Sequence, residues 1–181
     1  MKISKRNAII LAVVVLLLTI IVVSNIQYAE RGELDAASVN PRNGDIAYTY
    51  MGSGHMSVLT LVDANGGRLF SITLDNVGKP THHVWFDEND NVCVCLSMKK
   101  ADRVYSRDGT RLSQDSCTAS AKPHADAFAG WEKHGSAYET ACGDTRIVYD
   151  YRNGIECVFG QRASLTVYAP DGTGTEIWSN D

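Results

Sequence analysis

The sequence predicts an all-β domain of short antiparallel strands, preceded by one apolar N-terminal helix. Three observations support this fold class. Short strand-like segments alternate with turns rich in Asn, Asp and Gly from about residue 39 onward. No stretch of this part shows the periodicity of a long amphipathic helix. The N-terminus carries one long apolar run.

The apolar run forms the first element. Residues 8–23 contain no charge, and Thr19 is their only polar side chain. Extended through residue 26, the run is long enough to cross a bilayer as a helix. A cleaved signal peptide is the alternative, with a cleavage site near Ser24. The apolar region is long for a signal peptide and no Ala-x-Ala follows it, so a retained anchor over 8–26 is favoured.

The flanking charges predict the orientation of this helix. Lys2, Lys5 and Arg6 precede it, whereas only Arg31 follows it closely. Because cytoplasmic flanks are the more basic ones, residues 1–7 are predicted to be cytoplasmic. Residues 27–35 then form a linker, and residues 36–181 an extracytoplasmic β-repeat domain. The predicted location is the cell membrane, crossed once.

Charge and cysteine content limit the partners of the outer part. From residue 27 onward there are 14 Lys and Arg against 21 Asp and Glu, a net charge of −7. Such a surface repels phosphate backbones, so nucleic acid is excluded as a partner. All five cysteines lie in this part, where disulfides persist in an oxidising compartment. The odd number leaves at least one cysteine unpaired in a monomer.

The strands recur with a period. The segments LTLVDANGGRL, DRVYSRDGTRL and TRIVYDYRNGI align their turn glycines, Gly66, Gly109 and Gly154, which are 43 and 45 residues apart. An earlier turn opens an inner strand in each unit, and the residues at these inner turns are Gly44, Asn91 and Gly135. The pattern predicts about three units of roughly 44 residues, followed by a hairpin over residues 154–172.

The units resemble the blades of NHL-like and related β-propellers. The segment FDENDNVCVCLSMKKADRVYSRDGTRL (residues 86–112) shows the resemblance best, and VYAPDGT (residues 167–173) is similar. The resemblance implies propeller-like antiparallel blades over most of residues 39–178. Propellers usually close with four to eight blades, more than this chain supplies. An open assembly, closure through homo-oligomerisation and a shortened relative of a longer propeller all stay open.

The stretch HHVWFDENDNVCVC (residues 82–95) reads as a hairpin around DENDN. Its symmetry places His83 opposite Cys95 and Trp85 opposite Cys93, all on one face. The favoured interpretation is a strand pair buried on both faces, with cysteine acting as a small apolar residue. The alternative is a zinc or copper site with His83, Cys93 and Cys95 as ligands. His82, His124 or His134 would then supply a fourth ligand.

DENDN also allows a calcium site with alternating oxygen ligands from Asp87, Asn89 and Asn91. The loop lacks the Gly at position six and the Glu at position twelve of an EF-hand. Tight turns favour the same residues for backbone reasons. No cofactor is therefore predicted, with zinc, copper and calcium as alternatives. The acidic residues of the chain fall mainly in turns and are interpreted as solvated.

Residues 116–134 interrupt the third unit and form the candidate binding loop. Its candidate residues are His124, Asp126, Trp131 and His134. Long irregular segments on a β-scaffold often bind ligands or partners. The alternative is a covering loop that buries Phe128 and Trp131 against the core.

No motif of a known catalytic centre is present in the sequence. The favoured function is a membrane-anchored binding or protein-interaction module, with a protein or another cell-surface molecule as its partner. An exported propeller-type hydrolase or lyase is the alternative from another class. A truncated relative of a longer propeller is the third hypothesis.

Overall fold

The computed structural model of the 181-residue chain describes nine segments: residues 13–19, 34–52, 56–75, 81, 83–96, 103–116, 128, 130–152 and 162–180. Residues 13–19 are helical, and this is the described portion of the apolar segment predicted over 8–26. Within the described portion of the chain, no helix has the length and apolar character needed to span a membrane. The remainder of the predicted anchor lies outside the described residues.

The domain is all-β, as predicted, and consists of three antiparallel sheets. The central sheet contains β1 (Leu34–Val39), β2 (Ile46–Met51), β3 (Ser57–Val62) and β4 (Arg68–Thr73). The second sheet contains β5 (His83–Phe86), β6 (Val92–Cys95), β7 (Arg103–Tyr105) and β8 (Arg111–Leu112), followed by the 3-10 turn η2 (Gln114–Ser116). The third sheet contains β9 (Glu132–His134), β10 (Ala137–Cys142), β11 (Thr145–Arg152), β12 (Arg162–Tyr168) and β13 (Gly174–Ser179). Because β1 begins at Leu34, the first strand starts two residues inside the predicted linker.

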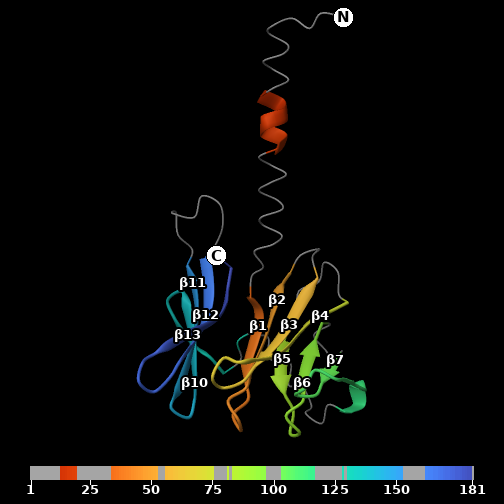
Figure 1. Cartoon of the computed structure of the whole chain (residues 1–181), viewed down its shortest axis with the longest axis vertical. Helices are drawn as coiled ribbons and strands as arrows, with labels where there is room; N and C mark the ends of the chain where they lie inside the picture. The colour runs from red at the N-terminus through yellow and green to blue at the C-terminus, as the bar shows by residue number, and fades with distance from the viewer. Residues whose placement is uncertain are drawn as a thin grey trace, which may run out of the picture.

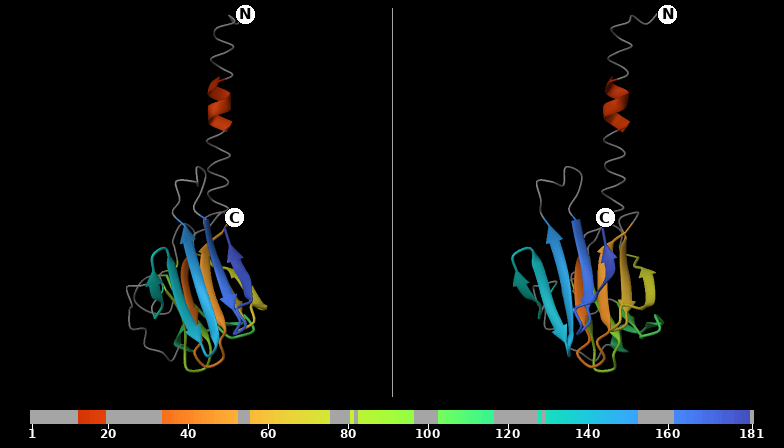
Figure 2. Two further views of the ribbon diagram at one scale, coloured as in Figure 1. Left: turned by 90° about the vertical axis from the view of Figure 1, so that its left-hand side faces the viewer. Right: turned by 60° about the vertical axis from the view of Figure 1, so that its left-hand side comes forward.

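The central sheet packs on both neighbours (Figures 1 and 2). One core joins it to the third sheet and includes Ile46, Ile147 and Leu165. The other joins it to the second sheet and includes Leu61 and Val94. Along β2, alternate side chains enter alternate cores, which buries the first four residues of this strand. Among the described residues, no core cluster joins the second sheet to the third.

One five-residue turn geometry occurs four times among the described residues. In the turns 63–67, 87–91, 106–110 and 169–173, the first N–H donates to the fifth carbonyl, and the fourth N–H donates to the first carbonyl. The fourth residue has positive φ, for example +85° at Gly66 and +84° at Gly172. A three-residue hairpin loop with a left-handed residue at its end has this geometry.

The third turn glycine of the predicted alignment, Gly154, lies outside the described residues. Among the described turns, β3–β4, β7–β8 and β12–β13 form the last hairpins of the three sheets, and their glycines with positive φ are Gly66, Gly109 and Gly172.

The predicted inner turn before β6 is confirmed, since Asn91 is the last residue of the β5–β6 turn and directly precedes Val92. The positive φ of +62° in this turn belongs to Asp90.

Tyr48 on β2 links the central and third sheets. Its ring is 4 % exposed and its hydroxyl donates to the carbonyl oxygen of Ile177 at 3.0 Å.

Burial raises the pKa of Tyr48 to about 12. The folded protein therefore holds the hydroxyl proton of Tyr48 more tightly than the unfolded chain, in which the pKa is about 10. The stability that this protonated hydroxyl contributes is complete below about pH 10 and is lost as the pH rises toward 12. We expect Tyr48→Phe to lose less stability than the wild type between these pH values, measured by urea unfolding. Equal losses in both proteins would contradict this assignment.

Candidate functional site

The turns of all three sheets gather at one end of the molecule, here called the loop end. It comprises residues 40–45, 63–67, 87–91, 106–110, 143–144 and 169–173. The strand registers explain the gathering, since Ile46 pairs with Val62, Val92 with Tyr105, and Arg146 with Tyr168. Figure 1 shows the turns β1–β2, β5–β6 and β10–β11 together at the lower end of the sheets.

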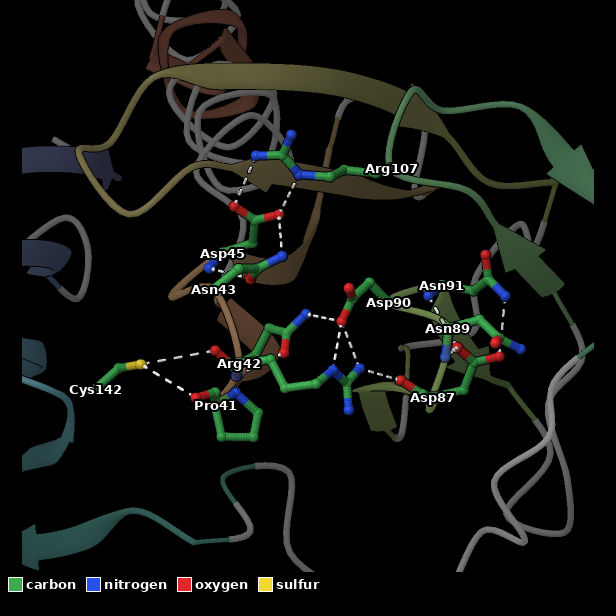
Figure 3. A network of polar contacts seen from close by, with 11 residues as sticks. Pro41, Arg42, Asn43, Asp45, Asp87, Asn89, Asp90, Asn91, Arg107 and Cys142 are labelled. Atoms are coloured by element: carbon green, nitrogen blue, oxygen red, sulfur yellow. Dashed lines mark hydrogen bonds and ion pairs between the residues drawn. The ribbon is translucent and has the colours of Figure 1, made fainter.

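Arg42 joins the β1–β2 turn to the β5–β6 turn. Its Nε donates to Asp90 Oδ1 at 2.7 Å, and its guanidinium also donates to the carbonyl oxygen of Asp87 (Figure 3). The Nδ2 atom of Asn40 donates to the same Asp90 oxygen at 2.7 Å. These two donors, Asn40 first and Arg42 second, lower the pKa of Asp90. Asn40 Oδ1 accepts the N–H of Arg42, so the three residues hold one another in place.

Arg107 joins the β7–β8 turn to the central sheet. Its Nε donates to Asp45 Oδ2 at 2.6 Å and its Nη2 to Asp45 Oδ1 at 3.1 Å, a bidentate pair. The side chain of Asp45 is 2 % exposed, whereas that of Arg107 is 54 % exposed. Hydrogen bonding to Asp45 raises the pKa of Arg107. The buried carboxylate therefore depends on an arginine from a different sheet.

Removal of Arg107 should destabilise the domain more than removal of Arg42. Arg107→Met leaves the buried Asp45 carboxylate without its charged partner, and we expect a loss of about 2–3 kcal/mol of unfolding free energy. Arg42→Met breaks a pair whose side chains are 45 % and 38 % exposed, and it should cost less than about 1 kcal/mol. Chemical denaturation of both variants at pH 7 measures the difference. Equal effects would show that burial of Asp45 does not determine the strength of its pair.

The interpretation of the turn carboxylates as solvated is wrong for Asp45 and Asp87, which are 2 % and 1 % exposed. Asp87 stabilises the DENDN turn. Its Oδ1 accepts the N–H groups of Asn89 and Asn91, each at 2.9 Å, and its Oδ2 accepts Asn91 Nδ2 at 3.0 Å. Both carboxylate oxygens of this predicted calcium ligand are thus used by the turn itself.

The predicted hairpin register is confirmed. His83 pairs with Cys95 and Trp85 with Cys93. The predicted burial holds for β6, whose four residues are all buried, whereas in β5 only Val84 is fully buried and the other three residues are partly exposed. Cys93 is in a disulfide, so its sulfur is not a thiolate ligand, while Cys95 is a free, buried thiol. The second cysteine of this bridge lies outside the described residues.

In the described segments, no three His, Cys, Asp or Glu side chains are grouped so as to hold a metal ion. The zinc, copper and calcium alternatives therefore receive no ligand set from these segments. His82 and His124, two of the predicted fourth ligands, lie outside them. The third, His134, lies 3.4 Å from Glu132 on the exposed strand β9, in a different sheet from Cys95.

A groove of about 310 Å³ opens at the loop end between the central and third sheets. It is lined by Ser38, Val39, Pro41, Gly130, Trp131, Thr140, Ala141, Cys142 and Gly143. The Sγ atom of Cys142 lies 3.7 Å from the carbonyl oxygen of Asn40 and 3.9 Å from that of Pro41, so this thiol joins the two sheets at the groove (Figure 3). Its lining combines two hydroxyl side chains with apolar surface and carries no charge.

The structure separates the residues of the predicted binding loop. Trp131 lines the groove and also packs partly buried on the core, with its ring 5.7 Å from that of Phe128. Phe128 is 7 % exposed, so the covering role predicted for these two aromatics is confirmed. His134 lies at the far end of β9, paired with Ala137. His124 and Asp126 lie outside the described residues.

Sequence reasoning missed Cys142, Arg42 and Arg107. Their roles depend on contacts with residues 45 to 102 positions away, and no local pattern marks them. The only sequence signal was their position in or beside Gly-containing and Asn-containing turns. A comparison with protein-family models and with curated proteins finds no match. The geometry of the loop end is therefore the basis for inferring the function.

Proposed function

We propose that the protein is a membrane-anchored, extracytoplasmic binding module that holds a protein or another cell-surface ligand at its loop end. The observation that carries this proposal is the groove beside Trp131 and Cys142, whose wall at Pro41 belongs to the β1–β2 turn that Arg42 and Arg107 fix to the second sheet. Fixed turns reduce the entropy lost on binding, which favours recognition. An exported hydrolase or lyase stays the alternative.

Two observations support the membrane location. The six consecutive apolar side chains from Val13 to Leu18 are each 45–60 % exposed, as expected of a segment whose partner is lipid. The disulfide at Cys93 belongs in an oxidising compartment.

The chain enters the domain at Leu34, at the opposite end of β1 from the turn 40–45. The loop end therefore points away from an anchor that precedes Leu34.

We also propose that the three sheets are blades of an incomplete NHL-like propeller. The shared five-residue turn and the four-stranded meanders support this proposal. The second and third sheets pack on opposite faces of the central sheet. The central sheet, which comes first in the sequence, therefore lies between the other two in space. A partner or a second copy would supply any missing blades.

Site-specific photo-crosslinking in intact cells tests the binding function. A photoreactive amino acid replaces Trp131 in one variant and Leu69, an exposed residue of β4, in the other. We expect a discrete cross-linked species with the first variant only, and labelling of Cys142 by a membrane-impermeant thiol reagent. Cross-linking that is the same at both positions would contradict a specific binding site, and labelling of Cys142 only after lysis would contradict the location.

A further inference from the structure

Along β10 the groove contains a strand position, here called the slot, that no described residue occupies. β9 pairs with only half of this strand, through Ala137, Tyr138 and Glu139. The ladder ends at the pair Glu132–Glu139, and the remaining residues of β10, from Thr140 to Cys142, line the groove. Within the described segments, the third sheet is thus one strand short along this half of its edge.

The backbone of Ala141 faces this position. Two-residue turns precede and follow β10, so the pairs His134–Ala137 and Cys142–Thr145 that flank these turns are hydrogen-bonded pairs. Hydrogen bonding alternates along an antiparallel strand, so even-numbered residues of β10 bond to β11 and odd-numbered ones face the β9 side. Ala141 therefore directs its N–H and C=O into the groove, where no described residue pairs with it.

The described residues directly ahead of β9, Phe128, Gly130 and Trp131, form a turn and do not continue the pairing. Gly130 has a φ of +85°, and the N–H of Trp131 donates to the carbonyl oxygen of Phe128 at 3.0 Å. Continued pairing would have placed Gly130 opposite Ala141. Instead, Trp131 lines the slot directly before the first residue of β9, and Val39 and Pro41 of the central sheet line it as well.

We propose that this slot takes an extended, basic peptide segment of a partner protein, which adds as a strand to β10. The inference rests on the proposed binding function and names the class of its partner. Strand addition supplies main-chain hydrogen bonds, and neighbouring side chains provide selectivity. The lining of the slot carries no charge, and the exposed acidic residues Glu132 and Asp144 directly follow the lining residues Trp131 and Gly143 in sequence. Arg42, the basic residue next to Pro41, is already paired with Asp90. A segment carrying Lys or Arg beside an alternating β-branched core complements these charges.

The test uses proline at position 141. Ala141→Pro removes the N–H that faces the groove and spares the hydrogen bonds to β11, and proline is tolerated on a strand whose N–H faces an open edge. Ala141→Ser keeps the N–H and is the matched control. A displayed library of random nine-residue peptides is selected on the full-length wild-type chain in detergent micelles and counter-selected on the Ala141→Pro protein.

We expect the enriched peptides to be alternating, basic and free of proline. Their affinity should fall about tenfold or more for Ala141→Pro and stay within about threefold for Ala141→Ser. N-methylation of the peptide at its pairing amides should cause a similar loss, and this arm does not depend on how well Ala141→Pro folds. The proposal is overturned by failure to enrich any peptide over the counter-selection, by enrichment of proline-rich or acidic sequences, or by binding that survives N-methylation.

Two results separate this inference from the binding function itself. If the species cross-linked at Trp131 persists in Ala141→Pro, the module binds its partner without strand addition, and only the inference fails. If light scattering shows a wild-type dimer that Ala141→Pro dissociates, the occupant is a second copy of this chain, which also overturns the proposal of a basic partner peptide.

Discussion

Replacement of Phe128 by alanine should destabilise the domain by about 3–5 kcal/mol. The ring of Phe128 stacks at 4.6 Å on Tyr138 and at 5.0 Å on Tyr149, and contacts Trp131 edge-on at 5.7 Å. These three aromatics come from β10, β11 and the segment before β9. Truncation would therefore leave a cavity where the covering segment meets the third sheet and would remove the support of Trp131 in the groove wall.

Phe128→Leu is the matched control, because it keeps most of the apolar volume and removes only the aromatic stacking. We expect it to cost about 1–2 kcal/mol. Urea unfolding followed by far-UV circular dichroism measures both variants. In the absence of urea, the peptides selected on the groove should also bind Phe128→Ala more weakly than Phe128→Leu. A Phe128→Ala protein within about 1 kcal/mol of the wild type would show that the aromatic cluster is a surface feature rather than part of the core.

The sequence was informative about strands and hairpins because these depend on neighbouring residues. The register of His83 with Cys95 followed from the symmetry of one short turn, and the structure has the same register. Turn residues such as Gly66 and Gly109 marked the last hairpins of two units for the same reason. In both cases the deciding interactions span only a few residues.

The candidate site was largely hidden from the sequence because it depends on how the sheets pack. The alternation of side chains between the two faces of β2 follows from its being a strand, but the sequence does not indicate which sheet covers each face. The partners of Asp45 and Cys142, by contrast, lie on other sheets, 62 and 102 residues away. Only Trp131 was placed in the candidate site beforehand, and it was chosen for its position in an irregular segment.

A reducing agent should destabilise the protein by about 2–4 kcal/mol, because Cys93 is in a disulfide and is fully buried in β6. Cys93→Ala should show the same loss without reductant and no further loss when reductant is added. Cys95→Ala is the matched control: this free thiol lies two residues away on the same strand and is 2 % exposed. It should cost about 1 kcal/mol and keep the full response to reductant.

Denaturation midpoints with and without dithiothreitol measure all three proteins, and peptide mapping of the oxidised chain identifies the partner of Cys93. A wild type that does not respond to reductant would show that the bridge contributes nothing to stability. An equal response in Cys93→Ala would assign the effect to another bridge. Alkylation of free thiols in intact cells before lysis then tests the location of the domain. A Cys93 found oxidised in cells requires the oxidising compartment that the proposed topology provides. A Cys93 found reduced would place the domain on the cytoplasmic side.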